Sequence, residues 1–397
     1  MKAKPEKEKN TVVREGEHLI GSFIGNADGP TLIAIGGIHG NEPAGAQAVK
    51  DVAEKLPQLA DRIDGRVFLL AGNTRALNRQ VRFIDCDLNR SWTPANMSSS
   101  GVRALECLSE GRELHELDEL LDQILITARA EVYILDLHST SASGLPFATV
   151  GDTLRNRKFA MGLPVTILLG IEEQLEGTML EYFNNAGAVT LGFEGGSHLS
   201  PETVDNHAAL LWLSLINADI LSRSDVPDYD EMYRRLANGR RGARVVEVRY
   251  RKAIDPEDGF EMNPGFNNFD PILKDQVLAH EKHGPVRAVE SGMILMPLYQ
   301  KLGEDGFFIG RAVAPFWLRI SSILRQMRVQ NIVGWLPGVA RDPNDHETLI
   351  VNTSLARFFP LQVFHLLGYR RRRWERKKLV VSRRRHDYVS PFENRRK

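Results

Sequence analysis

A histidine and a glutamate three residues apart follow the end of an apolar run. His39 and Glu42 come after the run 31–35 and the pair Gly36-Gly37. Imidazole and carboxylate are ordinary zinc ligands, and open α/β sheets bind ligands beyond the ends of their strands. The pair therefore indicates two ligands of a metal site at a sheet edge. Taken alone, the same two residues would also fit a capped helix start with a solvated glutamate.

A second histidine, His138, follows the apolar strand 132–135. It could be a third ligand that leaves the fourth position of a tetrahedral zinc site open for water, as in catalytic zinc sites. Asp136 lies two residues earlier, so its side chain points the same way along a strand and could orient the imidazole. The alternative is a hydrogen-bonded histidine in a polar turn.

A glutamate with free space around it ends another strand. Glu194 follows the run 189–191 and precedes two glycines. Its carboxylate could take a proton from a metal-activated water and later deliver it to a leaving nitrogen. The alternative is a helix-capping or solvated glutamate.

The segment 72–102 is rich in Asn, Arg and Asp and has little periodicity. A loop of this length inside a compact domain is usually functional. Its guanidinium groups could bind a substrate carboxylate or stabilise an oxyanion. For Arg75 and Arg79 we favour a solvated loop with internal Asp–Arg pairs.

Alternating strands and helices must position these residues. The predicted strands are 31–36, 66–71, 132–137, 145–150, 164–169 and 189–194, and the predicted helices are 43–56, 112–129, 177–186 and 201–222. This alternation predicts an α/β fold with helices on both faces of the sheet. Composition changes over 223–243, and the later predicted strands are 244–251, 286–290, 293–299 and 307–313.

We therefore divide the 397 residues into four parts. They are a polar leader over 1–17, a catalytic α/β domain over 18–225, a β-rich domain over 240–341 and an apolar, then basic tail over 342–397.

Composition narrows the class of protein. The polar N-terminus does not resemble a signal peptide, no apolar stretch is long enough to span a bilayer, and Cys86 and Cys107 are the only cysteines. These features predict a cytoplasmic protein.

Net charge is zero but unevenly distributed. Residues 370–397 hold thirteen Lys or Arg and three acids, so of the 51 basic and 51 acidic residues, 38 and 48 remain in 1–369. The basic tail could contact anionic lipid or nucleic acid. The alternative is a helix and strand docked on the acidic body with solvated arginines. We expect removal of 370–397 to leave turnover of a small substrate intact.

Five motifs resemble the succinylglutamate desuccinylase/aspartoacylase family, a branch of the zinc carboxypeptidases. They are Gly36-Gly37-Ile38-His39-Gly40-Asn41-Glu42, Asn73-Thr74-Arg75-Ala76, the run from Arg82 to Arg90, Asp136-Leu137-His138-Ser139-Thr140 and Gly192-Phe193-Glu194. They occur in the family's order over most of 18–222, with a fainter match over 284–314. The resemblance implies a carboxypeptidase-like mixed sheet flanked by helices, followed by a small β-rich domain.

The resemblance also implies roles for individual residues. His39, Glu42 and His138 would bind one Zn²⁺ per chain, and Glu194 would be general base and then general acid. Arg82 would stabilise the oxyanion, Asn89 and Arg90 would bind the substrate's carboxylate, and Tyr299 would lie at the mouth of the site. The alternative for Tyr299 is plain packing.

The implied reaction is hydrolysis of the amide of a small N-acylated amino acid or related amine. Aspartoacylases proper carry an Arg and a Tyr shortly before the base glutamate. The corresponding stretch 179–185 has no Arg, and Tyr182 is not at the matching place, which puts acetylaspartate in doubt as the substrate. The alternatives are a carboxypeptidase acting on short peptides and a non-catalytic binding protein anchored by its tail. A homo-oligomer also stays open.

Overall fold

The computed structural model describes residues 13–171, 174–198, 200–238, 243–300, 303–352, 361–375 and 378–393, and for 361–362 and 371–375 it describes the backbone alone. Most of the predicted leader and part of the predicted tail lie outside these ranges. None of the helices within them is both long and apolar enough to cross a membrane.

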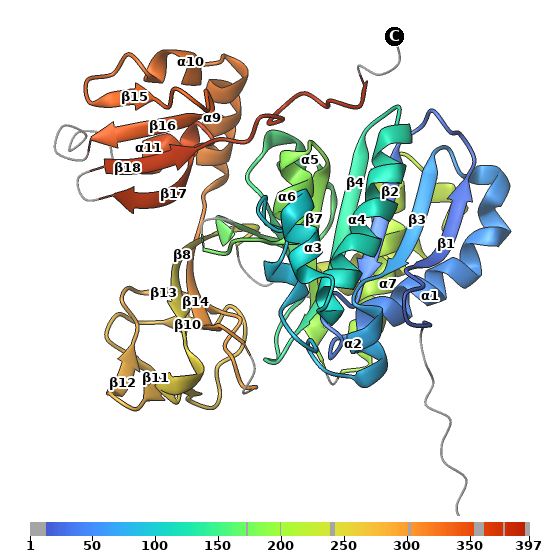
Figure 1. Cartoon of the computed structure of the whole chain (residues 1–397), viewed down its shortest axis with the longest axis horizontal. Helices are drawn as coiled ribbons and strands as arrows, with labels where there is room; N and C mark the ends of the chain where they lie inside the picture. Colours follow the sequence, from blue (N-terminus) through green and yellow to red (C-terminus); the bar gives the residue numbers. More distant parts are fainter. Residues whose placement is uncertain are drawn as a thin grey trace, which may run out of the picture.

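Strands and helices alternate through the body of the molecule (Figure 1). The strands are β1 (Leu19–Ile24), β2 (Thr31–Gly36), β3 (Arg66–Ala71), β4 (Val132–Thr140), β5 (Phe147–Val150), β6 (Thr166–Leu169) and β7 (Val189–Ser197). The helices are α1 (Pro43–Lys55), α2 (Thr74–Arg79), α3 (Ser99–Leu105), α4 (Ser109–Thr127), α5 (Leu154–Gly162), α6 (Met179–Asn185), α7 (Glu202–Asn217) and α8 (Tyr229–Asn238).

The predicted α/β fold is confirmed as a mixed sheet flanked by helices. Strand order in the large sheet is β1-β3-β2-β4-β7-β5-β6-β8-β14-β13-β10. β3, β2, β4 and β7 are parallel, whereas β5 runs antiparallel to β7. All six strands predicted for the body are present. The sequence analysis missed β1, α2, α3 and α8. The first three are short or at the edge of the sheet and carry weak periodicity, and α8 lies in the segment 223–243 that was interpreted as a domain boundary.

Both faces of the central strands are buried. Successive side chains of β2 alternate between two apolar cores, as strand geometry requires. Leu32 and Ala34 pack in the core that includes residues of α1, α5 and α7, and Ile33 and Ile35 pack in the core that includes residues of α4 and α6. This two-sided burial explains why the parallel strands are continuous apolar runs.

The β-rich part continues the same sheet instead of forming a separate one. Its strands are β8 (Val245–Ala253), β9 (Glu261–Met262), β10 (Pro271–Ile272), β11 (Val277–Glu281), β12 (Gly284–Arg287), β13 (Gly292–Leu295) and β14 (Asp305–Ala312). β8 pairs with β6 of the body and with β14. A smaller sheet has the order β12-β11-β9.

A third lobe follows β14 (Figure 1). Its elements are α9 (Pro315–Gln326), α10 (Gln330–Val333), β15 (Val339–Arg341), β16 (Thr348–Asn352), α11 (Leu361–Leu366), β17 (Arg370–Glu375) and β18 (Lys378–Ser382). Its sheet has the order β15-β16-β18-β17. The lobe thus begins inside the range 240–341, which was predicted to be a β-rich domain. It begins with a helix, and Pro315 in the first turn of α9 favours a helix start there.

A buried carboxylate joins this lobe to the body. Asp152, which precedes α5, forms ion pairs with Arg157 at 2.5 Å, with Arg325 of α9 at 2.9 Å and with Arg370 of β17. Burial would raise the pKa of Asp152, but the three guanidinium groups hold it well below its usual range. The lobe therefore docks through a charged network and not through apolar contacts alone.

The end of the chain returns to the body. Asp387 accepts a hydrogen bond from the backbone N–H of Leu154 at 2.8 Å, at the start of α5. Phe392 is buried in the same core as Met179 and Phe183. Removal of residues 370–397, which was expected to leave turnover of a small substrate intact, would also take Phe392 out of the core of the body.

We expect Asp152→Asn to lower the free energy of unfolding by about 3–5 kcal/mol, because it leaves buried guanidinium groups without their counter-charge. Chemical denaturation measures this change. The matched control is Asp230→Asn, whose carboxylate pairs with Arg223 at the exposed surface and should change stability by no more than about 1 kcal/mol. Equal effects of the two substitutions would contradict the role given to Asp152.

Phe392→Ala should lower the free energy of unfolding by about 3–5 kcal/mol, the usual cost of removing a buried aromatic ring. Val389→Ala, three residues earlier and exposed, is the control and should have a small effect. A Phe392→Ala protein as stable as the parent would show that the end of the chain is not part of the core.

Candidate functional site

Two glycines shape the turn between β2 and α1. Gly37 has φ +78°, a conformation that residues with a Cβ rarely adopt. A Cβ on Gly36 would lie 2.3 Å from the backbone nitrogen of Ala46, so α1 approaches the strand end closely. This turn carries His39 and Glu42 to the carboxyl edge of the sheet.

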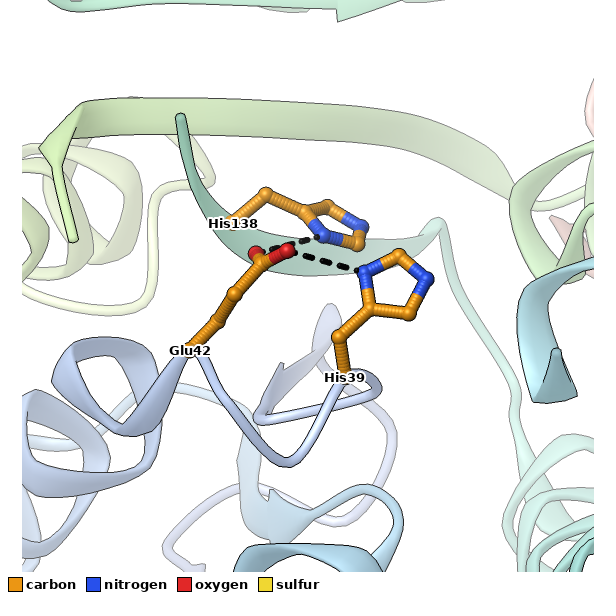
Figure 2. Close-up of side chains that lie close together, drawn as sticks. All are labelled: His39, Glu42 and His138. Carbon is orange, nitrogen blue, oxygen red and sulfur yellow. Dashed lines mark hydrogen bonds and ion pairs between the residues drawn. The ribbon is translucent and has the colours of Figure 1, made fainter. Parts of the chain in front are cut away.

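His39, Glu42 and His138 converge on one point, and we call them the ligand cluster (Figure 2). Glu42 Oε1 lies 3.0 Å from His39 Nδ1, and Glu42 Oε2 lies 3.3 Å from His138 Nδ1. Glu42 is 3% exposed and its side chain does not cap α1, so the alternative of a capped helix start with a solvated glutamate is wrong. Burial would raise the pKa of Glu42, but the two imidazoles hold it well below its usual range.

The cluster fits zinc in chemistry and spacing. Its donor atoms lie within 4.8 Å of one another. Around tetrahedral zinc with bonds of about 2.0–2.2 Å, ligand atoms are about 3.3–3.6 Å apart, close to the 3.0 and 3.3 Å observed. Two imidazoles and one carboxylate would leave a fourth position for water.

Carboxylates contact the Nε2 atoms of both imidazoles and so orient the rings. Asp136, fully buried, lies 2.7 Å from His138 Nε2, which is the contact expected from their spacing along β4. Asp87 lies 3.1 Å from His39 Nε2. Each ring thus has its Nδ1 toward Glu42 and its Nε2 toward another carboxylate. Metal-bound histidines usually hold their second ring nitrogen against a carboxylate or carbonyl oxygen in this way.

Glu194 lies beside His138 because of the sheet register. The two residues are Cα partners in the parallel pair β4–β7. Glu194 Oε2 is buried and has no hydrogen-bond partner among the described residues. Burial raises the pKa of Glu194 to about 7, although the neighbouring His138 favours the charged form. A carboxyl group in this state can accept and release a proton near neutral pH.

Arg82 lies next to the cluster. Its Nη2 is 2.9 Å from His39 Nε2 and donates to Asp87 Oδ2 at 3.1 Å, and its Nη1 is 3.5 Å from Glu42 Oε1. Arg82 and Asp87 thus form a pair that lies against the cluster. The pairing with a loop aspartate that was predicted for Arg75 is wrong, because Arg75 pairs with Glu113 and Glu116 of α4.

Two buried glutamates of α4, which the sequence analysis missed, hold this loop. Glu110 accepts hydrogen bonds from the backbone N–H groups of Ile84, Asp85 and Cys86. Glu113 accepts from Thr74 and pairs with Arg75. The sequence did carry a signal for their burial, because each glutamate lies on the face of the helical pattern that is otherwise apolar.

The remaining predicted site residues line the cavity, but each is already bonded within the protein. Asn89 Oδ1 accepts from the backbone N–H of Met179 at 3.0 Å. Arg90 Nη2 donates to Asp305 Oδ2 at 3.2 Å. The hydroxyl of Tyr299 accepts from the backbone N–H of Phe266 at 2.9 Å, which agrees with packing at the mouth.

A cavity of about 1460 Å³ contains the cluster, Glu194 and Arg82. The β-rich part supplies one wall, with Tyr299 and Asp305 among its residues. Arg384, from the segment after β18, also lines it, and the sequence analysis missed this residue. Its guanidinium group donates to Asn185 and to Glu181, the latter at 3.2 Å. An arginine from the predicted tail thus reaches the stretch 179–185, which lacks one of its own.

A second group of possible ligands lies outside the cavity. His18, Glu113 and Glu116 also have donor atoms within 4.8 Å of one another. The guanidinium group of Arg75 donates to Glu113 at 2.6 Å and to Glu116 at 2.8 Å. Because this cation already compensates the two carboxylates, we do not assign a metal there.

Comparison with known proteins identifies the body. Residues 28–209 match the model of the succinylglutamate desuccinylase/aspartoacylase catalytic domain. They belong to this family of catalytic domains. The desuccinylase/aspartoacylase domain therefore includes His39, Glu42, Arg82, His138 and Glu194.

Curated relatives of this domain have several substrates in their names. A probable aspartoacylase of Acaryochloris marina is 32% identical over 30% of this chain and 39% of its own length. An N-acyl-aromatic-L-amino acid amidohydrolase (carboxylate-forming) of Xenopus tropicalis is 30% identical over 28% and 34%. A succinylglutamate desuccinylase of Pseudomonas paraeruginosa is 30% identical over 29% and 33%. The match thus spans only about a third to two-fifths of these relatives.

Solved structures share the fold over a longer part of the chain. A succinylglutamate desuccinylase/aspartoacylase from Rhodobacter sphaeroides is 19% identical, covers 72% of this chain and 86% of its own, and has a TM-score of 0.54. The product-bound ectoine utilization protein EutE (DoeB) from Ruegeria pomeroyi is 19% identical, covers 73% and 88%, and has a TM-score of 0.52.

We expect one zinc ion per chain by metal analysis of the purified protein. His138→Ala should abolish this stoichiometry, because it removes one of three protein ligands. His18→Asn, in the group compensated by Arg75, is the control and should retain one zinc. Two ions per chain, or loss of the metal in the control, would contradict the assignment of the site to the ligand cluster.

Proposed function

We propose that the protein is a zinc-dependent amidohydrolase that deacylates a small N-acylated amino acid or related amine. The observation that carries this proposal is the buried Glu194 carboxyl beside His138, in one cavity with the ligand cluster. A metal site alone would serve binding or structure. A metal site with an adjacent carboxyl group poised to exchange protons serves hydrolysis.

His39, Glu42 and His138 would hold the zinc. When bound there, zinc would supply a Lewis acid and a water of lowered pKa. Asp136 and Asp87 would keep the two imidazoles in place through their Nε2 atoms. The role of these carboxylates is therefore to position the ligands.

Glu194 would accept a proton from the attacking water as the new C–O bond forms at the amide carbon. It would then pass that proton to the amide nitrogen as the C–N bond breaks. The overall change is water plus amide to carboxylate plus amine. Arg82 is placed to stabilise the charge that develops on the carbonyl oxygen, since its guanidinium group lies against the ligand cluster.

The cavity is compatible with several classes of acylated substrate and does not select a single one. Its volume of about 1460 Å³ exceeds the roughly 300–1,000 Å³ of common small-molecule sites. The amine part of the substrate can therefore be larger than a single aspartate. Arg90, Arg384 and the neutral amide of Asn89 all line the cavity, and in our proposal they bind the substrate's carboxylate. Tyr299 would act only by shaping the mouth.

The test is a hydrolysis screen of N-acetyl, N-succinyl and N-formyl amino acids and amines with the zinc-loaded protein. Glu194→Gln should retain zinc and lower kcat by about 10²–10⁴-fold, because it removes general acid–base catalysis. Glu261→Gln, an exposed residue at the rim of the same cavity, is the matched control and should keep the parent's kcat. An active Glu194→Gln enzyme would refute the role of Glu194, and zinc loading without hydrolysis of any acyl class would refute the proposed reaction.

A further inference from the structure

The third lobe exposes a concentration of large apolar side chains on α9, α10 and the residues that follow them. Trp335 is 85% exposed and Met327 is 70% exposed. The other members are Phe316, Trp317, Ile323 and Ile332, each at least half exposed. Single exposed apolar residues are ordinary, but six within twenty residues mark an interaction surface.

On α9 the apolar side chains form a stripe. Phe316, Ile320, Ile323 and Met327 follow the i, i+4, i+7, i+11 spacing of one helix face. The opposite face is already occupied, because Ser321 and Arg325 are buried there and Arg325 pairs with Asp152 of the body. The stripe is therefore not the side by which α9 packs on its own lobe.

The surface is cationic as well as apolar. Residues 306–341 include five arginines and no aspartate or glutamate. Arg325 is buried and Arg311 pairs with Glu290, so the free positive charge of the surface comes from the remaining arginines. Arg319 and Arg328 are exposed, and no carboxylate pairs with either of them within the described ranges. Arg328 lies over the ring of Tyr388, 5.9 Å from its centroid. The half-exposed Val389 follows Tyr388 and extends the apolar area.

The apolar and cationic side chains of this surface distinguish among three kinds of partner, namely a second copy of the chain, a nucleic acid and a lipid bilayer. A symmetric dimer brings the same patch of two copies together, so arginines would face arginines with no acid in the segment to offset them. Nucleic acid would offset the charge but would not cover Ile323, Met327 and Ile332. An anionic bilayer provides negative head groups for the arginines and an acyl region for the aromatic and aliphatic side chains.

We propose that α9, α10 and Trp335 form a docking surface for the face of an anionic lipid bilayer. The residues of this surface do not line the catalytic cavity. Docking would therefore leave the cavity open to small substrates, and the proposal does not depend on the reaction proposed above.

The experiment is co-sedimentation of the full chain with phosphatidylcholine vesicles that contain or lack phosphatidylserine. We expect binding to the anionic vesicles, weakened by added salt as for other surface charges. The double variant Trp335→Ser with Met327→Ser should reduce this binding by roughly tenfold or more, because it removes two apolar contacts with the bilayer.

The matched control replaces two equally exposed apolar residues outside the surface, Leu273→Ser with Ile126→Ser, and should bind like the parent. Zinc content and thermal unfolding of each variant verify that it is folded. Absence of binding to anionic vesicles, or equal loss in both double variants, would overturn the proposal. A concentration-dependent dimer that the Trp335 and Met327 changes disperse, without vesicle binding, would show instead that the surface joins two copies of the chain.

Discussion

The parallel register of β2, β4 and β7 determines the site. Pairing of Gly36 with Leu137 and of His138 with Glu194 brings three strand ends to one edge of the sheet. The side chains that follow these ends must therefore meet. A shift by one residue would turn His138 toward the other face. Burial of both faces of the strands prevents such a shift, since it would exchange the side chains of the two apolar cores.

Buried carboxylates perform much of the positioning around this edge. Glu42, Asp136, Glu110 and Asp152 are all buried, and each is compensated by cations, imidazoles or backbone N–H groups. Burying a charge is costly unless it is paired or hydrogen-bonded. Each of these groups therefore restricts the arrangement of its neighbours to the one that satisfies it. Glu194 differs, because its carboxyl is buried without a comparable set of partners, as suits a group that must gain and lose a proton.

The third lobe links the site to the rest of the chain. It attaches through Asp152, and the segment that follows its last strand contributes Phe392 to the core of the body and Arg384 to the wall of the cavity. The desuccinylase/aspartoacylase model ends at residue 209, so these contacts come from outside the family domain. A distant segment supplies to the stretch 179–185 the arginine that this stretch lacks, since Arg384 donates to Asn185 and Glu181.

The sequence alone determined six of the seven strands β1 to β7, the residues that converge in the ligand cluster and the family, because residue chemistry and the period of apolar side chains are local properties. His39, Glu42, His138 and Glu194 could each be found beside a recognisable strand end. The tertiary structure decided what depends on surfaces that are far apart in the chain. In the tertiary structure, much of the basic tail belongs to a lobe that is docked on the body, and Arg90 pairs with Asp305. Glu110 accepts hydrogen bonds from the loop, and one face of α9 stays exposed. These outcomes depend on which buried charge meets which partner, and no local pattern specifies that choice.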